Sequence, residues 1–140
     1  MLTQIYKNII LVIIVLILFS ADKPLTANNK PNENAIKNLI NGINSQNDGL
    51  KRSSIYLSGC YKINETVDAL VKLIDHEVNI STKLLIIRSL YNIGDLKGMI
   101  KIHDISLYDE NDNVRSIAAA VYQAYLLINT PFDKLVVVQR

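Results

Sequence analysis

The sequence is short of several residue types, and each shortage excludes a class of structure. It contains no tryptophan and a single cysteine, Cys60, among 140 residues. A lone cysteine cannot form an internal disulfide, so a disulfide framework does not hold this fold together. The three prolines, Pro24, Pro31 and Pro131, all lie outside the segments expected to be helical. That placement is favourable because proline lacks the backbone N–H that a helix interior needs.

Glycine clusters and an excess of one charge are also missing. The five glycines are scattered, so no glycine-rich loop is available to bind phosphate. Fifteen basic residues are nearly balanced by 13 acidic residues, which gives a net charge of +2. Proteins that bind nucleic acid usually carry a clustered positive charge, so we expect no nucleic-acid partner.

The composition that remains is that of a folded globular chain. Apolar residues make up 49% of the sequence and charged residues 20%, which is enough apolar side chain to bury a core. The length favours a single domain.

The segment over 1–32 differs from the rest of the chain. Lys7 precedes an unbroken apolar run over residues 9–19, which suits the central part of a signal peptide and is shorter than the roughly 20 residues of a membrane-spanning helix. We expect residues 1–21 to be an export signal and the protein to be periplasmic or secreted. Because Phe19 makes a poor cleavage site, an uncleaved N-terminal anchor is the alternative, and it would be the only contact with a membrane. Residues 22–32 are predicted to be a disordered linker.

A 32-residue period organises residues 33–128. Lys51, Lys83 and Arg115 each follow an expected turn, and the differences 83 − 51 and 115 − 83 are both 32. Regular recurrence of this kind is typical of repeat proteins. The sequence therefore predicts three units of two helices each. The expected helices cover residues 33–45 and 48–61, 65–76 and 79–93, and 96–107 and 112–127.

The expected turns carry residues that begin or end helices. Asp48, Asn79 and Asp112 are predicted to cap the helices that follow them, because their side chains can accept from free backbone N–H groups. Asn64 is predicted to do the same ahead of Glu65. Gly94 is predicted to adopt the left-handed conformation that commonly follows a helix end.

The helix over 79–93 is predicted to be apolar on two sides, as expected for the central unit of a stack. Its apolar positions are Ile80, Leu84, Ile87, Tyr91, Ile86, Leu90 and Ile93. Its remaining side is predicted to face away from the core and holds Ser81, Leu85, Arg88, Ser89 and Asn92. A helix at the end of a stack should be more polar on its outer side. The first helix meets this expectation with Asn38, Asn41 and Asn44.

Two motifs resemble HEAT repeats. One is the pattern Asp-x-Val-Arg-x-x-Ala-Ala that begins at Asp112, and the other is Leu-Tyr-Asn-Ile-Gly-Asp over residues 90–95. The short period is similar to that of the HEAT-like repeats first noted in phycobilisome lyases. The resemblance covers residues 33–128. It implies an all-α fold, an α-solenoid of about three two-helix repeats that binds other proteins. It also implies that Asp112 with Arg115, and Lys83 and Lys51, are structural ties between units.

The resulting functional prediction is an exported, non-catalytic interaction or scaffolding module for an unidentified protein partner. The alternatives are an accessory or lyase-like enzyme of the same repeat class, and a membrane-tethered adaptor. Projection by one repeat places Tyr56, Arg88 and Ala120 in one exposed row, with Cys60, Asn92 and Ala124 in the next. Because Tyr and Arg are enriched at protein interfaces, Tyr56, Arg88 and Asn92 are the candidate binding face.

Other candidate sites lack the residues that their chemistry requires. Cys60 with His76 or His103 could form a nucleophile and base, but no signature of an activated cysteine surrounds Cys60. His76 and His103, near Asp75, Glu77 and Asp104, lack the spacing of a zinc motif. We therefore expect no catalytic residue, no metal and no cofactor.

The segment over 109–113 begins like a calcium-binding loop. Asp109, Asn111 and Asn113 occupy alternate positions. An EF-hand then needs Gly at its sixth position and Glu at its twelfth, where this chain has Val114 and Ala120. We interpret these polar residues as the start of the last helix, whose dipole favours negative charge.

The tail over 129–140 departs from the repeat at Pro131. It contains the apolar run Leu135-Val-Val-Val138. The tail either covers the exposed apolar side of the last unit or remains mobile.

Overall fold

The computed structural model describes residues 31–129, and this part of the chain is all-α. It consists of six α-helices and one short 3₁₀ helix, with no strand between residues 31 and 129. In chain order they are α2 (Glu33–Ile43), α3 (Asp48–Cys60), η1 (Asn64–Thr66), α4 (Val67–Ile74), α5 (Ile80–Ile93), α6 (Leu96–Tyr108) and α7 (Asp112–Asn129). The predicted helical fold class is confirmed, and each predicted helix is present with boundaries shifted by at most two residues.

Three predictions fall on segments outside the described residues. They are the export signal over 1–21, the linker over 22–32 except its last two residues, and the tail beyond Asn129. No helix within residues 31–129 is long and apolar enough to cross a membrane.

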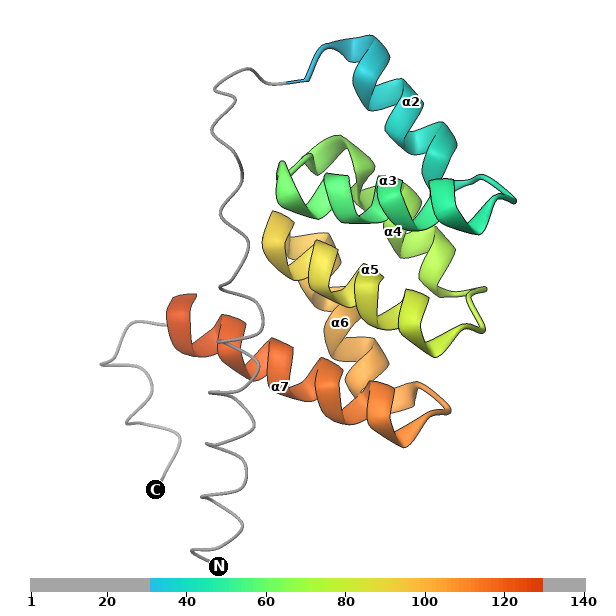
Figure 1. Cartoon of the computed structure of the whole chain (residues 1–140). Helices are drawn as coiled ribbons and strands as arrows, with labels where there is room; N and C mark the ends of the chain where they lie inside the picture. Colours follow the sequence, from blue (N-terminus) through green and yellow to red (C-terminus); the bar gives the residue numbers. More distant parts are fainter. Residues whose placement is uncertain (1–30, 130–140) are drawn as a thin grey trace, which may run out of the picture.

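The helices form two layers (Figure 1). Helices α3, α5 and α7 lie side by side in one layer and run in the same direction. In the other layer, α4 packs against both α2 and α6. Consecutive helices also pack as pairs, α2 with α3, α4 with α5 and α6 with α7. The chain thus alternates between the layers, which places the turns that precede α3, α5 and α7 along one edge.

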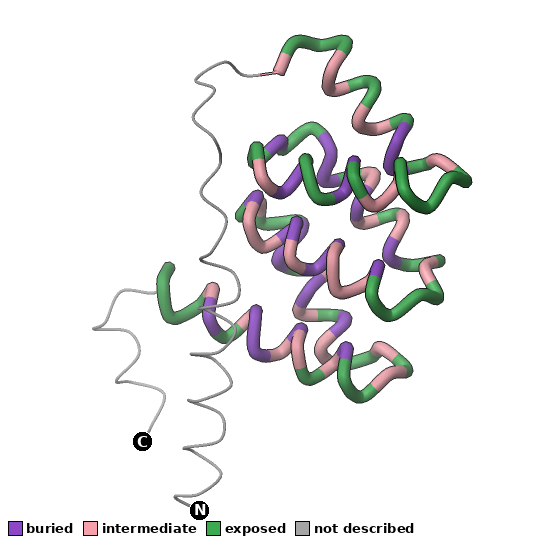
Figure 2. Tube along the Cα trace, in the orientation of Figure 1, coloured by how far each residue is buried: buried purple, intermediate pink, exposed green. Residues whose placement is uncertain are grey.

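One core runs through all six helices. Buried positions lie where the two layers meet, as Figure 2 shows in purple. The fully buried large side chains include Ile43, Ile55, Leu70, Ile86, Ile87, Leu90, Met99, Ile102, Val114 and Val121. Removing one such side chain from water contributes about 1.5–3 kcal/mol. Because every helix supplies at least one of these residues, each α-helix depends on its neighbours for stability.

Helices α3 and α5 meet at a close junction. A Cβ atom added at Gly59 would lie 2.7 Å from the Cα of Ser89, so the two backbones approach as closely as glycine permits. Ser89 Oγ donates to the carbonyl oxygen of Ile55 at 2.9 Å, and Arg52 Nη1 donates to Thr82 Oγ1 at 2.9 Å. The prediction that Ser89 faces away from the core is wrong. Its small hydroxyl fits against α3 because it finds a backbone acceptor there.

Helix starts are set by asparagine more often than predicted. Asn79 accepts from the Thr82 N–H at 3.0 Å and caps α5 as predicted. The predicted caps of α3 and α7 are wrong by one residue. Asn47 accepts from the Leu50 N–H at 3.0 Å, and Asn111 from the Val114 N–H at 3.2 Å. Asp48 and Asp112 are instead the first helical residues.

Two further turn predictions have opposite outcomes. Asn64 does not cap a helix, because it lies within η1 and no side-chain cap precedes α4. Gly94 follows α5 with φ of 76° and donates its N–H to the Leu90 carbonyl, as predicted for a left-handed helix end. The outer polar residues of the first helix, Asn38, Asn41 and Asn44, are exposed as expected.

Candidate functional site

The turns before α3, α5 and α7 share one hydrogen-bonding scheme. In each turn, a side chain two residues before the capping asparagine accepts that asparagine's N–H. Ser45 Oγ accepts from Asn47 at 3.1 Å and Glu77 Oε1 from Asn79 at 2.9 Å. Asp109 Oδ1 accepts from Asn111 at 2.9 Å. The capping residues recur every 32 positions, since 79 − 47 and 111 − 79 are both 32.

Lysines extend this scheme from one turn to the next. Lys51 and Lys83 each lie four residues after a capping asparagine. Lys83 Nζ forms an ion pair with Asp109 Oδ2 at 2.6 Å, and Lys51 Nζ lies 3.8 Å from Glu77 Oε2. Both contacts join a helix to the turn that begins the next helix of its layer. The Lys83–Asp109 pair is largely shielded, with side-chain exposures of 18% and 7%.

Arg115 has local partners instead. Its Nη1 donates to the carbonyl oxygen of Asp109 at 2.5 Å and to that of Glu110 at 3.2 Å. Its Nη2 forms an ion pair with Asp112, three residues earlier. These contacts of Asp112 and Arg115 fasten the start of α7 to its own turn, whereas the lysines reach the neighbouring turn.

Asp109 has the most perturbed carboxyl group of the site. Partial burial acts to raise its pKa, but the hydrogen bonds from Lys83 and from the Asn111 N–H oppose this effect. The positive charges of Lys83 and Arg115 add to that opposition, and the net result is a lowered pKa. Asp109 is therefore held in its ionised form by the contacts that join α5 to the α6–α7 turn.

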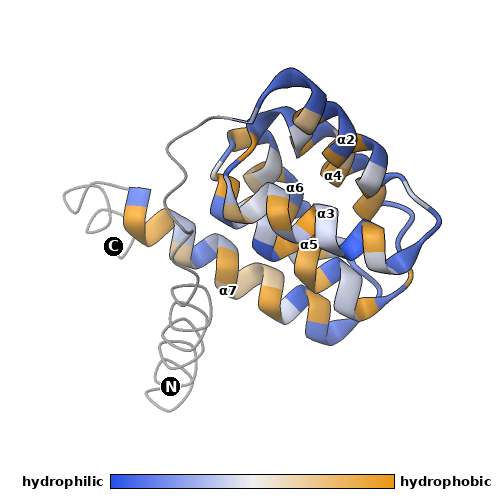
Figure 3. Ribbon diagram, turned by 45° about the horizontal axis from the view of Figure 1, so that its top comes forward, coloured by the Kyte–Doolittle hydropathy of each residue, from blue (hydrophilic) through white to orange (hydrophobic). Residues whose placement is uncertain are grey.

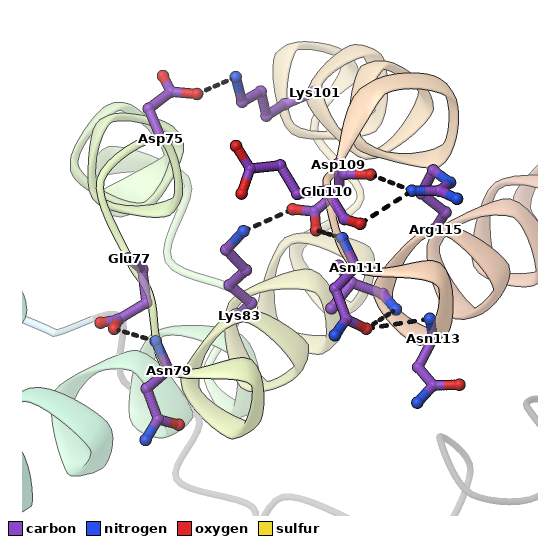
Figure 4. A network of polar contacts seen from close by, with 11 residues as sticks. Asp75, Glu77, Asn79, Lys83, Lys101, Asp109, Glu110, Asn111, Asn113 and Arg115 are labelled. Atoms are coloured by element: carbon purple, nitrogen blue, oxygen red, sulfur yellow. Dashed lines mark hydrogen bonds and ion pairs between the residues drawn. The ribbon is translucent and has the colours of Figure 1, made fainter.

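A cleft of about 850 Å³ lies between the α4–α5 turn and the α6–α7 turn. Figure 4 shows Lys83 and Lys101 extending toward acidic residues at this place. Lys101 forms an ion pair with Asp75 and helps to join α6 to the end of α4. The cleft is lined by two lysines and by five acidic residues, Asp75, Glu77, Asp104, Asp109 and Glu110. Carboxylates outnumber ammonium groups, so the cleft has an excess of negative charge.

The rim of the cleft is apolar and accessible. Val78 is 90% exposed and Tyr108 is 79% exposed, and both line the cleft together with Ile80. Asp104 and Glu110 form no ion pair with another residue between 31 and 129. The cleft thus combines exposed apolar groups with carboxylates that a positively charged ligand can reach.

The predicted binding face lies elsewhere, on the layer formed by α3 and α5. Tyr56 is 42% exposed, whereas Arg88 and Asn92 are partly buried. Tyr56 follows Ile55, and Arg88 precedes Ser89. The hydrogen bond from Ser89 to the Ile55 carbonyl oxygen joins these two helices. Two residues that the projection by one repeat places in the same rows, Ala120 and Ala124, are buried.

The residues considered for nucleophilic catalysis or metal binding have different surroundings in the structure. Cys60 is a partly buried free thiol at the end of α3, and His76 lines the cleft. The His103 ring lies 4.5 Å from the Tyr122 ring, between centroids. Between residues 31 and 129, no group of three or more His, Cys, Asp or Glu side chains is arranged to hold a metal ion.

Helix capping also explains the loop that begins like a calcium site. Asn111 Oδ1 accepts from the N–H groups of Asn113 and Val114. Asp109 is engaged with Lys83 and with the Asn111 N–H. These oxygens therefore have protein partners in the described structure.

Comparisons with protein-family models, curated proteins and solved structures find no match to this chain.

Proposed function

We propose that this chain is a non-catalytic protein-interaction module built as a small α-solenoid of HEAT-like repeats. The 32-residue recurrence of capping asparagines and lysines supports the repeat assignment, as does the alternation of helices between two layers. Repeat stacks of this kind present extended surfaces rather than enclosed reaction sites. Export through residues 1–21 is part of the proposal and rests on the sequence.

The cleft between the two turns is the observation that carries the binding function. Its volume of about 850 Å³ lies within the range of pockets that bind specific ligands. Its carboxylates favour a cationic ligand, and its exposed rim residues Val78 and Tyr108 favour apolar contact. We infer that the ligand is a segment of another protein in which Lys or Arg lies next to an apolar residue.

Affinity capture with matched variants tests this function. The full chain serves as bait for proteins of the exported fraction, beside the double variant Asp104→Lys/Glu110→Lys. Glu33→Lys at the start of α2 is the control, because it makes one such charge reversal at a site away from the cleft. We expect the double variant to capture about one tenth as much partner as wild type, or less, which corresponds to a loss of about 1.4 kcal/mol in binding free energy. The control should capture as much partner as wild type.

Two outcomes count against the proposal. Equal capture by wild type and the double variant would exclude the cleft, and no capture by any bait would exclude the interaction module. Weaker capture at high salt is expected, because exposed charges are screened. N-terminal sequencing of the mature protein tests export, and recovery from the cytoplasm with Met1 intact would contradict it.

A further inference from the structure

An apolar stripe is exposed on α6, on the side away from α4. Leu96, Ile100 and Leu107 recur at helical spacing, with His103 between them. Ile100 is 54% exposed and Leu107 is 53% exposed. His103 contacts Tyr122 of α7, and exposed Leu126 lies one turn beyond Tyr122 on that helix. We call Leu96, Ile100, Leu107 and Leu126 the terminal stripe.

The preceding unit shows what these positions normally contact. Ile100 and Leu107 lie one repeat after Asp68 and Asp75, since 100 − 68 and 107 − 75 are both 32. Asp68 pairs with Lys97 at 2.7 Å, and Asp75 pairs with Lys101, so both acids face the next helix of their layer. The same positions of α6 therefore face outward, where no helix within residues 31–129 follows.

The side chains at this end do not suit contact with water. The outer face of a terminal repeat is normally polar. Here isoleucine and leucine occupy the positions that correspond to Asp68 of α4 and to Asp75, the residue that follows α4. Figure 3 shows that hydrophobic residues continue along α7 to its C-terminal end. There Leu126, Leu127 and Ile128 are all exposed. A surface of this kind is typical of one that another segment covers.

We propose that residues 131–138 of the same chain fold back over the terminal stripe. Phe132 and the run Leu135-Val-Val-Val138 supply apolar side chains to match it. Pro131 follows closely on the end of α7, and proline disfavours a continued helix because it lacks a backbone N–H.

The geometry permits this fold-back. Helices α6 and α7 pack together and are joined by only residues 109–111, so α7 runs back from the end of α6. With 18 residues against 13, α7 extends beyond the other helices at its C-terminal end (Figure 1). Leu96, the first residue of α6, belongs to the stripe. On α6 the stripe runs from Leu96 to Leu107, eleven steps along the helix or roughly 16 Å. The nine residues from 130 to 138 can extend roughly 30 Å, which is nearly twice the length of the stripe.

The tether also favours this segment over a second copy of the chain. A short flexible connection gives a binding segment an effective concentration on the order of millimolar. A second molecule reaches the stripe only at its own, much lower, concentration. The proposal does not depend on the cleft, which lies at the opposite end of α6 from Leu96. The cleft and the terminal stripe share that helix but have no residue in common.

Disulfide trapping in the full chain tests the proposal. In a Cys60→Ser background, cysteines are introduced as Ile100→Cys and Val137→Cys, and oxidation is followed on non-reducing gels with mass spectrometry of the linked peptides. The control pairs Val137→Cys with Leu57→Cys, an exposed position on α3. We expect an intramolecular link at Ile100→Cys to form at least about tenfold faster than the control link, independently of protein concentration.

The proposal is overturned if both pairs react at the same rate, or if Ile100→Cys forms mainly links between molecules, which would assign the stripe to a second copy. A measurement without cysteines guards against a poor disulfide geometry. Val137→Asp in the otherwise natural chain should speed amide hydrogen exchange in α6, and Leu50→Asp, at an exposed site on α3 outside the stripe and the cleft, should not. Unchanged exchange in the Val137→Asp variant also overturns the proposal.

Discussion

Gly59→Ala is the most direct perturbation of the junction between the first and second helical pairs. The added Cβ would lie 2.7 Å from the Cα of Ser89 and 2.9 Å from its Cβ and Oγ. The nearest atom belongs to the backbone, so a rotamer change of Ser89 cannot relieve the clash. Helices α3 and α5 must move apart, and the hydrogen bond from Ser89 to Ile55 must lengthen from 2.9 Å.

The magnitude follows from three contributions. Overpacking a close helix junction costs about 1–3 kcal/mol. Loss of the Ser89 hydrogen bond costs about 1 kcal/mol. Alanine in place of glycine within a helix returns about 1 kcal/mol. We therefore expect the free energy of unfolding to fall by about 2–3 kcal/mol, since the overpacking cost should lie near its upper limit against a backbone atom.

Urea unfolding followed by circular dichroism measures this change. Gly49→Ala is the control, because it makes the same substitution in the first turn of α3, where the nearest atom to the added Cβ is the side-chain Oδ1 of Asn47 at 3.3 Å. We expect the control to change stability by less than about 1 kcal/mol. The double variant Gly59→Ala/Ser89→Gly should remain unstable, because the clash with the backbone of residue 89 persists. A Gly59→Ala variant as stable as wild type would refute the close approach of α3 to α5.

Three further predictions concern the turns and the core. Asp109→Asn should lower stability at pH 7 by about 2 kcal/mol, the value of a hydrogen bond to a charged group, because it leaves Lys83 without its anion. The pKa of Asp109 is lowered by folding, so the unfolded chain binds more protons between the folded pKa and the unfolded value near 3.9. Wild type should therefore lose this stabilisation as pH falls below about 4. Asp109→Asn should lack that part of the pH dependence when the free energy of unfolding is measured by urea titration at each pH. Parallel curves of unfolding free energy against pH for the two proteins would contradict this. Asn79→Ala should cost about 1 kcal/mol and weaken amide protection in the first turn of α5, and unchanged protection would argue against the cap. Ile87→Ala should cost about 2–5 kcal/mol in thermal unfolding, because Ile87 is fully buried, and a cost below about 1 kcal/mol would show that its site is not packed.

The helices are predictable because their apolar positions recur at helical spacing. The capping residues of α3 and α7 are harder to predict, since Asp48 and Asp112 have side chains as suitable for capping as those of Asn47 and Asn111. Geometry decides between them, because the cap must lie just outside the helix with extended backbone. Neighbouring acceptors of equal quality cannot be ranked from the sequence.

Ser89 shows a second limit. A helical wheel sorts residues by polarity, and it places Ser89 with Arg88 and Asn92 on the outer side. The structure buries Ser89, because a small hydroxyl satisfied by the Ile55 carbonyl suits a close helix junction. The sequence signal is the pair of small residues, Gly59 and Ser89, on two helices of the same layer. That signal becomes readable only when the register of α3 against α5 is known.

The sequence does not predict the cleft, although its residues are candidates singly. By residue type alone, the candidates for metal ligands include His76, Asp75, Glu77 and Asp104. Asp109 is part of a loop that begins like a calcium site. They meet because two turns 32 residues apart lie along one edge of the layer formed by α3, α5 and α7. A sequence signal does exist, because Glu77 and Asp109 are 32 residues apart and each lies two residues before a capping asparagine.

The charged residues of the cleft fall into two groups, those that form ion pairs within the protein and those that form none within residues 31–129. Lys83 and Lys101 are occupied by Asp109 and Asp75, and these ion pairs join the elements that form its walls. Replacing either member of the shielded Lys83–Asp109 pair would alter the cleft and the stability together. Asp104 and Glu110, without an ion pair inside residues 31–129, offer charge that a ligand can neutralise without weakening the packing of the helices. A binding test must therefore change these two acids and leave the two lysines in place, because only then does lost binding report on the ligand's contacts rather than on the fold.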